Sequence, residues 1–260
     1  MTQPAGEPMF DHEPEKNGYA DVSHIGIEAA DPGFCPEGIC DGSGWILGDD
    51  NAARPCACRE PRINRAHSRR MGTGIPKRFR GISFERKPVV DMDPFVLRTV
   101  REFTDRIAER LEQGRGLWFY GDVGTGKTSL AMLVSRTALE AGRSVAIYSV
   151  PRLLADIKET YERDSGDSYL SFFRRLCDVD LLHLDDLGAE KRTEWVLEQL
   201  YSIVNERWQE ESSIVVTTNI IDMDELREQV GTRTVSRLTE ICGEPIPIMG
   251  RDLRRATPLR

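Results

Sequence analysis

The sequence has 260 residues and lacks any apolar stretch of the roughly 18 residues that identify a membrane-spanning helix. Its first residues are acidic and contain neither a basic segment nor an apolar one, so we expect no export signal and a cytoplasmic location. Cysteine is scarce, at six residues, which excludes a disulfide scaffold. Apolar residues make up 39% of the chain, which is too much for a wholly disordered protein and enough for one α/β core with a small extra module.

Charge is distributed unevenly along the chain. Residues 1–58 carry eleven acidic and two basic side chains, and residues 1–30 show no helical or strand periodicity, which predicts a disordered acidic tail. Residues 59–80 reverse the sign, with eight basic side chains against one acidic one. We interpret residues 61–80 as a basic linker, which either extends by self-repulsion or contacts phosphates. Residues 81–260 are expected to form one domain.

Four of the six cysteines lie close together in the sequence. They are Cys35, Cys40, Cys56 and Cys58. Thiolates at this density favour tetrahedral zinc, which would stabilise a module at residues 31–60 that is too small for its own core. The spacing departs from the common C-x2-C pairs, so an iron–sulfur cluster or a redox disulfide remains an alternative. His67 could substitute as a ligand or be solvated, whereas Cys177 and Cys242 lie in apolar patterns and are expected in the core.

Short apolar runs alternate with helical patterns in the remaining chain. The runs cover residues 117–120, 145–150, 181–184, 214–218 and 245–249. They predict buried parallel strands, and the segments between them predict crossover helices. An earlier helix is expected to begin at Asp93-Pro94 and to continue to Leu111. This pattern indicates an α/β fold with a doubly wound parallel sheet, whose ligands bind at the carboxyl ends of the strands.

A glycine-rich motif follows the first of these strands. Its residues are Gly121, Asp122, Val123, Gly124, Thr125, Gly126, Lys127 and Thr128. They match G-x-x-x-x-G-K-[ST], the phosphate loop in which backbone N–H groups surround the β-phosphate. Lys127 would contact the β- and γ-phosphates, Thr128 would bind Mg²⁺, and Ser129 begins the helix that completes the nucleotide site. The motif predicts ATP and Mg²⁺ as cofactors.

Polar residues follow two later strands. Asp185 and Asp186 end the run at residues 181–184, and Asn219 follows the run at residues 214–218. We interpret Asp185 as a magnesium ligand, Asp186 as the residue that polarises the attacking water, and Asn219 as a residue that orients this water. Asp186 is one methylene shorter than glutamate, so slow hydrolysis is expected. Solvated turn residues are the alternative for all three.

Two arginines four residues apart, Arg233 and Arg237, lie on one face of a predicted helix, where one could reach a neighbouring subunit's nucleotide. A surface pair with ordinary salt bridges is the alternative. Together the motifs GDVGTGKT, LLHLDDLG, VVTTN, GTRTVSRL and GRDLR resemble the AAA+ ATPases of the DnaC/DnaI/IstB group, which includes bacterial and phage replicative-helicase loaders. The resemblance covers residues 75–258 and implies a P-loop AAA+ domain at residues 81–260 without a full helical lid. It implies that Arg237 is an arginine finger acting in trans, with Arg233 beside it, and that Arg254 is sensor 2.

The resemblance also implies a function. The chain would be an ATP-dependent loader that self-associates through ATP at subunit interfaces, assembles on single-stranded DNA and delivers a replicative hexameric DNA helicase. Its amino-terminal zinc (Zn²⁺) module would contact the helicase. Residues 151–176 are expected to form two helices that follow the DNA strand. The residues that suit DNA contacts there are Lys158, Arg174, Arg175, Tyr161, Tyr169, Phe172 and Phe173. The alternative is that the aromatic residues belong to the core, which is favoured for Phe172 and Phe173.

A family segment that borders adenine is matched weakly by Ile75-Pro76 and Phe79. Two other functions remain open. One is an IstB-type transposition ATPase that acts on duplex DNA with a transposase, and the other is a P-loop phosphotransferase for a small molecule.

Overall fold

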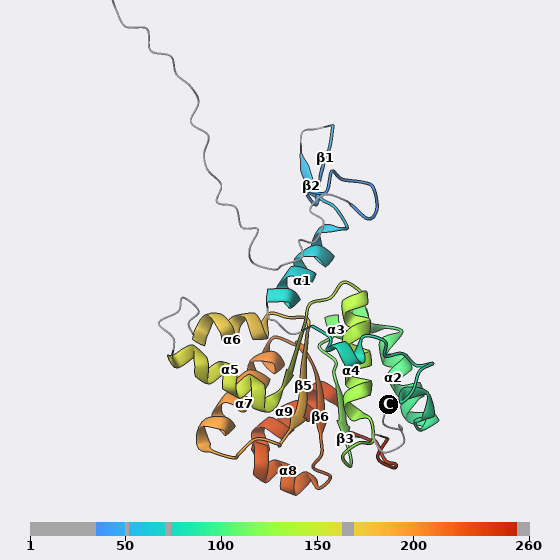
Figure 1. Ribbon diagram of the computed structural model, residues 1–260. Helices are drawn as coiled ribbons and strands as arrows, with labels where there is room; N and C mark the ends of the chain where they lie inside the picture. The colour runs from blue at the N-terminus through green and yellow to red at the C-terminus, as the bar shows by residue number, and fades with distance from the viewer. Residues whose placement is uncertain (1–34, 50–51, 71–73, 163–168, 254–260) are drawn as a thin grey trace, which may run out of the picture.

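The computed structural model describes residues 35–49, 52–70, 74–162 and 169–253. Its centre is a parallel sheet of five strands in the order β4-β5-β6-β3-β7 (Figure 1). The strands are β3 (Leu117–Tyr120), β4 (Val145–Ser149), β5 (Leu181–Leu187), β6 (Ser213–Thr218) and β7 (Ile246–Pro247). The doubly wound parallel sheet expected from the sequence is therefore confirmed.

Helices cover both faces of the sheet (Figure 1). One face carries α2 (Pro94–Thr104), α3 (Ile107–Glu112) and α4 (Lys127–Glu140). The other carries α5 (Val150–Glu162), α6 (Tyr169–Cys177), α7 (Glu194–Gln209), α8 (Met223–Val230) and α9 (Thr232–Cys242). Strands β3, β4, β5 and β6 each contribute to both cores because their side chains alternate, whereas β7 contributes Ile246 to the core that contains α4. In β3, Leu117 and Phe119 pack towards α4, whereas Trp118 packs towards α7 and α9.

The helix predicted from Asp93 to Leu111 is interrupted. Asp93 caps α2 as expected, since its carboxylate accepts hydrogen bonds from the backbone N–H groups of Phe95 and Val96. The chain leaves the helix at Asp105, and α3 begins at Ile107. The apolar residues of α2 and α3 still pack together despite this interruption, because both helices bury them in the same core as α4. Two short 3-10 turns precede α2, at Lys77–Phe79 and Val89–Asp91.

The amino-terminal described residues form a separate hairpin and a helix. Strands β1 (Trp45–Leu47) and β2 (Ala53–Pro55) pair antiparallel, and α1 (Arg59–Arg70) follows them. Figure 1 shows that α1 lies between this hairpin and the sheet. The side-chain amide of Asn64 donates to the Gly142 carbonyl at 3.0 Å, and the Ser68 hydroxyl accepts from the Val145 N–H at 2.8 Å. Helix α1 therefore attaches at the amino-terminal end of β4.

This helix corrects the expectation of an extended basic linker from residue 61. Two arginines of this helix contact the cysteine-containing hairpin. The Arg59 guanidinium lies 4.2 Å from the centre of the Trp45 ring, and Arg62 donates to the Gly42 carbonyl. The predicted tail at residues 1–30 lies outside the described residues and stays a prediction. Within the described ranges, no helix combines the length and apolarity needed to cross a membrane.

A buried arginine of α7 bonds to the end of α6, to the loop before β5 and to the start of β6. Arg207 of α7 is fully buried, and its guanidinium donates to the carbonyls of Cys177, Val179 and Ser213 at 2.9, 3.0 and 2.7 Å. Burial lowers the pKa of Arg207 to about 10, so the side chain remains charged at neutral pH. The cation thus supplies hydrogen-bond donors to carbonyl groups of three separate segments inside the protein.

Replacing Arg207 with methionine should lower the free energy of unfolding by about 3 kcal/mol, because several buried carbonyls would lose their donor. Urea denaturation followed by circular dichroism measures this change. Arg98→Met is the matched control, since Arg98 is exposed on α2. Equal stability of the two variants would contradict the structural role assigned to Arg207.

Candidate functional site

The glycine-rich motif forms the loop between β3 and α4. Tyr120 ends the strand and Lys127 begins the helix. Gly124 and Gly126 have φ values of 86° and 100°, in the left-handed region that favours glycine. A Cβ atom on Gly124 would lie 2.0 Å from the Asp252 carboxylate, so this position also has no room for a side chain. The strand–loop–helix context required of a phosphate loop is present.

Lys127 lies inside this loop. Its side chain is only 4% exposed, and its ammonium donates to the carbonyls of Gly121 and Asp122 at 2.8 and 2.7 Å. The Thr125 hydroxyl donates to the Asp122 carbonyl at 2.9 Å, which closes the turn. The ammonium and the amino-terminal end of α4 therefore place positive charge at the same loop, where they could stabilise a bound polyphosphate.

Asp185 meets the phosphate loop from the end of β5. Its carboxylate accepts hydrogen bonds from the Thr128 hydroxyl at 3.3 Å and from the Thr217 hydroxyl at 2.7 Å. Burial opposes ionisation of Asp185, but His183 and the two hydroxyl groups outweigh it and hold the pKa of this carboxyl below its usual value. Asp185 is therefore ionised at neutral pH. An ionised carboxylate beside a hydroxyl could hold Mg²⁺, which prefers oxygen ligands.

Asp186 leaves the regular strand. The pairing of β5 with β6 is irregular between Leu184 and Leu187, and Asp186 has a φ of 59°. Aspartate tolerates this left-handed conformation better than most residues. The Asp186 N–H donates to the Thr217 hydroxyl at 2.9 Å, and its carboxylate accepts from the Asn219 amide at 2.9 Å. The bulge therefore turns the Asp186 side chain towards Asn219, at the edge of the sheet where β5 and β6 end.

Sequence reasoning missed two residues of this network. Thr217 is buried and bridges the neighbouring acids, accepting from the Asp186 N–H while donating to Asp185. His183 is buried too, with Nδ1 2.9 Å from the Ser135 hydroxyl of α4 and Nε2 3.8 Å from the Asp185 carboxylate. The sequence signal that could have identified them is a polar residue within an apolar run, His183 in residues 181–184 and Thr217 in residues 214–218. Such a residue needs a partner when the strand is buried.

The predicted arginines occupy different places. Arg233 and Arg237 lie on α9, with their guanidinium carbons 5.9 Å from the Tyr201 ring centre and 3.4 Å from the Trp208 ring centre. Arg254 lies outside the described residues. The segment just before it does reach the phosphate loop, because the Leu253 N–H donates to the Gly124 carbonyl at 3.0 Å.

The weakly matched adenine segment packs beside α4. Ile75 and Phe79 are half-buried against the core that α2 and α4 share. Met92 lies in the same region, and its terminal methyl would be 2.1 Å from a Cβ atom on Gly126. Met92 therefore places apolar surface beside the phosphate loop, where a nucleotide base could pack against it.

The four clustered cysteines converge in the amino-terminal hairpin. Their Sγ atoms all lie within 4.8 Å of one another, with Cys35 3.8 Å from Cys56 and Cys40 3.6 Å from Cys58. Tetrahedral zinc with Zn–S bonds of about 2.3 Å implies sulfur–sulfur separations of about 3.8 Å. A hydrogen bond from the Cys40 backbone lowers the pKa of Cys35 to about 6, while burial raises the pKa of Cys58 to about 12. The geometry and the donor atoms therefore fit a zinc ion.

Residues 151–176 contain the two expected helices, α5 and α6, on the face of the sheet away from α4. Phe172 and Phe173 are half-buried against this core, as a structural role predicts. Tyr169 stacks on Tyr161 at 5.2 Å and donates to the Gln199 amide oxygen at 2.9 Å.

The remaining candidates in this segment are more accessible. Lys158 lies 5.0 Å from the Trp195 ring centre, and Arg175 donates to the Ser171 hydroxyl at 2.8 Å. Lys158 and Arg174 are exposed, and Tyr161 is 55% exposed. The exposed basic side chains, together with Tyr161, are thus the surface that a nucleic acid could contact.

Comparisons with known proteins agree with this geometry. The family model described as "IstB-like ATP binding protein" matches residues 97–237, which is more than half of the chain. The uncharacterized protein YdaV of Escherichia coli K12 is 32% identical over 134 residues, covering 51% of this chain and 53% of that protein. The replicative helicase loader DnaC of the same organism is 30% identical over 139 residues, covering 54% of this chain and 53% of that protein. The chain thus spans about half the length of these relatives.

A crystal structure of the DnaC helicase loader has the same fold. It superposes with a TM-score of 0.58 and 25% identity, and the match covers 67% of this chain and all of that structure. The matched family region contains the phosphate loop, Asp185, Asp186 and Asn219. This chain belongs to the family of IstB-like ATP binding proteins, within the DnaC/DnaI/IstB group of AAA+ proteins.

Proposed function

We propose that this protein is an ATP-dependent loader that assembles on single-stranded DNA and delivers a replicative DNA helicase. One observation carries the ATP-dependent part: the phosphate loop, Thr128 and the Asp185–Thr217–Asp186–Asn219 network converge at the carboxyl edge of the sheet. The loader part rests on similarity to proteins named replicative helicase loader. Hydrolysis between subunits would release the loader from the delivered helicase.

Each site residue has a proposed role in ATP binding and hydrolysis. Lys127 would contact the β- and γ-phosphates of bound ATP, while Thr128 and Asp185 would hold Mg²⁺. Asp186 accepts a hydrogen bond from Asn219, and we assign this pair to the attacking water. The short Asp186 side chain, already bonded to Asn219, supports slow hydrolysis that assembly or a partner stimulates.

The amino-terminal hairpin has a proposed role of its own. The four cysteines would hold zinc, and the module would contact the helicase. The hairpin exposes the apolar side chains of Ile39, Trp45 and Leu47, which are 56%, 44% and 69% exposed. Exposed apolar residues on so small a module favour an interaction surface.

Single-stranded DNA should bind better than duplex, and binding should need ATP and weaken with salt, because assembly aligns several copies of the α5–α6 segment. The net charge of −8 opposes indiscriminate DNA binding. Arg174→Glu should weaken binding about tenfold, whereas Arg98→Glu on the opposite face of the sheet should not. Fluorescence anisotropy with single- and double-stranded oligonucleotides measures both effects.

Helicase capture provides the second half of this test. Full-length protein should co-purify with the cognate hexameric helicase, whereas Cys40→Ser/Cys58→Ser protein should bind DNA but lose the helicase. Equal or tighter binding to duplex, with no helicase retained by the unmodified protein, would overturn the loader function.

The second candidate is an IstB-type transposition ATPase that acts on duplex DNA with a transposase. The matching family model, described as IstB-like, favours it. Both candidates share ATP binding at the same loop, so nucleotide assays do not separate them. Preference for duplex DNA in the same anisotropy experiment would place this candidate first.

A further inference from the structure

The guanidinium of Arg237 is held by two side chains from different helices. Its central carbon lies 3.4 Å from the centre of the Trp208 ring, and one terminal nitrogen donates to the Glu240 carboxylate at 2.8 Å. The other oxygen of Glu240 accepts from the Trp208 indole N–H at 2.8 Å. These three side chains form a closed set of contacts, which we call the Arg237 clamp.

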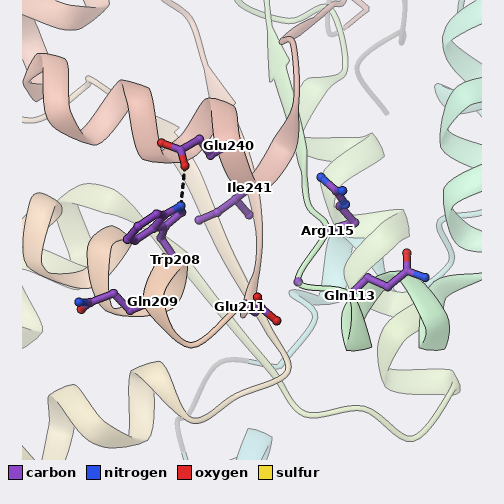
Figure 2. Close-up of a pocket in the computed structure, with 8 residues that line it drawn as sticks. Gln113, Arg115, Trp208, Gln209, Glu211, Glu240 and Ile241 are labelled. Atoms are coloured by element: carbon purple, nitrogen blue, oxygen red, sulfur yellow. Dashed lines mark hydrogen bonds between the residues drawn. The ribbon is translucent and has the colours of Figure 1, made fainter.

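The clamp lies where α7 and α9 end. Figure 2 shows the Trp208 and Glu240 side chains facing each other from neighbouring helices beside a pocket of about 600 Å³. Gln113, Gly114 and Arg115, which precede β3, line the same pocket. The pocket is therefore at the amino-terminal edge of the sheet, while the phosphate loop follows the carboxyl end of β3. This separation favours action of Arg237 on a nucleotide held by another subunit.

The contacts restrict both the plane and the direction of the guanidinium. Stacking on the indole fixes the plane, and the bond to Glu240 fixes rotation within that plane. Glu240 is itself oriented by the Trp208 N–H, so its carboxylate cannot rotate without losing a hydrogen bond. An exposed ion pair between residues three apart on one helix does little by itself to hold an arginine in one orientation. The additional contact with an aromatic ring on a second helix restricts the Arg237 guanidinium further. The Arg237 side chain nevertheless remains 29% exposed and accessible to a neighbour.

We propose that Trp208 and Glu240 are positioning residues for Arg237 as it acts on the nucleotide of an adjacent subunit. This inference rests on the proposed ATP-dependent assembly. Holding the arginine in one orientation before assembly reduces the entropy lost when it meets developing charge in the transition state. Loss of either residue should therefore lower kcat and leave the KM for ATP nearly unchanged.

Mixed oligomers separate positioning from a general structural role. Arg237→Ala protein keeps its own phosphate loop, so added Lys127→Ala protein should restore ATP hydrolysis by donating its arginine. A Lys127→Ala/Glu240→Gln donor should restore about tenfold less activity than the Lys127→Ala donor does. A Lys127→Ala/Trp208→Leu donor should show a similar loss. Trp208→Phe in the donor keeps the stacking ring and should restore an intermediate activity.

The matched control donor is Lys127→Ala/Glu210→Gln, which removes the same charge from an exposed residue at the end of α7. It should restore as much activity as Lys127→Ala alone. Circular dichroism and co-purification of tagged subunits establish that each donor folds and assembles.

The outcomes distinguish the positioning role from the proposed function. Full restoration by the Glu240→Gln donor, at an unchanged KM, would overturn the positioning role while the trans arrangement stands. Failure of the simple Lys127→Ala donor, in oligomers shown to be mixed, would overturn the trans arrangement itself and the positioning role with it. If Trp208→Leu protein does not fold, the Glu240→Gln donor still decides the proposal.

Discussion

Lys127→Ala protein should bind ATP about a thousandfold more weakly, a loss of ~4 kcal/mol, because the variant lacks charge-assisted hydrogen bonds to two phosphates. The fold should persist, since helix α4 is also held by Leu130, Ala131 and Val134, all fully buried in the core. The Gly121 and Asp122 carbonyls, which Lys127 contacts, lie in a loop that water can reach once the side chain is removed. Titration with a fluorescent ATP analogue measures the affinity.

The matched control is Lys191→Ala, an exposed lysine outside the phosphate loop, which should bind ATP normally. Thermal unfolding of both variants shows whether the core is intact. Unchanged affinity in a folded Lys127→Ala protein would contradict the phosphate-loop assignment. Weak binding in both variants would point to a general effect of charge instead.

Purified protein should contain about one zinc equivalent, and its removal should unfold the hairpin at residues 35–58. Strands β1 and β2 have three residues each, and the buried cluster of this hairpin consists of Cys35, Cys56 and Cys58 with Cys40 and Ile46 partly buried against it. So small a core cannot offset the entropy of ordering the chain. Zinc binding to such sites supplies about 10–16 kcal/mol, so its loss should have a large effect.

Metal analysis of protein purified in a reducing buffer determines the identity of the ion. Hydrogen exchange after chelation should show lost protection in residues 35–58. The chelated protein should still bind ATP normally, because the hairpin and the phosphate loop lie at opposite ends of the sheet (Figure 1). Cys58→Ser protein should lose the metal, while Cys177→Ser, outside the cluster, should retain it. Iron with visible absorbance, or no metal in reduced protein, would contradict the zinc site.

The sequence could predict the phosphate loop because every residue of that motif lies within eight consecutive positions. Backbone geometry over so short a span depends on local residues, above all on glycine at positive φ. The parallel sheet was predictable for a related reason, since buried strands between crossover helices are apolar along their whole length. The four cysteines were likewise found from their density in the sequence.

The tertiary structure decided which residues from distant parts of the sequence come into contact. Thr217 lies 32 residues from Asp185, yet its hydroxyl bonds to that carboxylate because β5 and β6 are neighbours in the sheet. The basic segment forms a helix whose Asn64 and Ser68 bond to the chain beside β4. The order of charges in the sequence could not reveal these contacts.

The Arg237 clamp is the clearest case of this difference. Its arginine was visible as a motif, but Trp208 became relevant only when α7 and α9 packed together. The sequence alone determined which chemical groups the protein carries and where the local motifs begin. The tertiary structure decided which of these groups meet, because hydrogen bonds and stacking need contact distances that only the packing of separate elements creates.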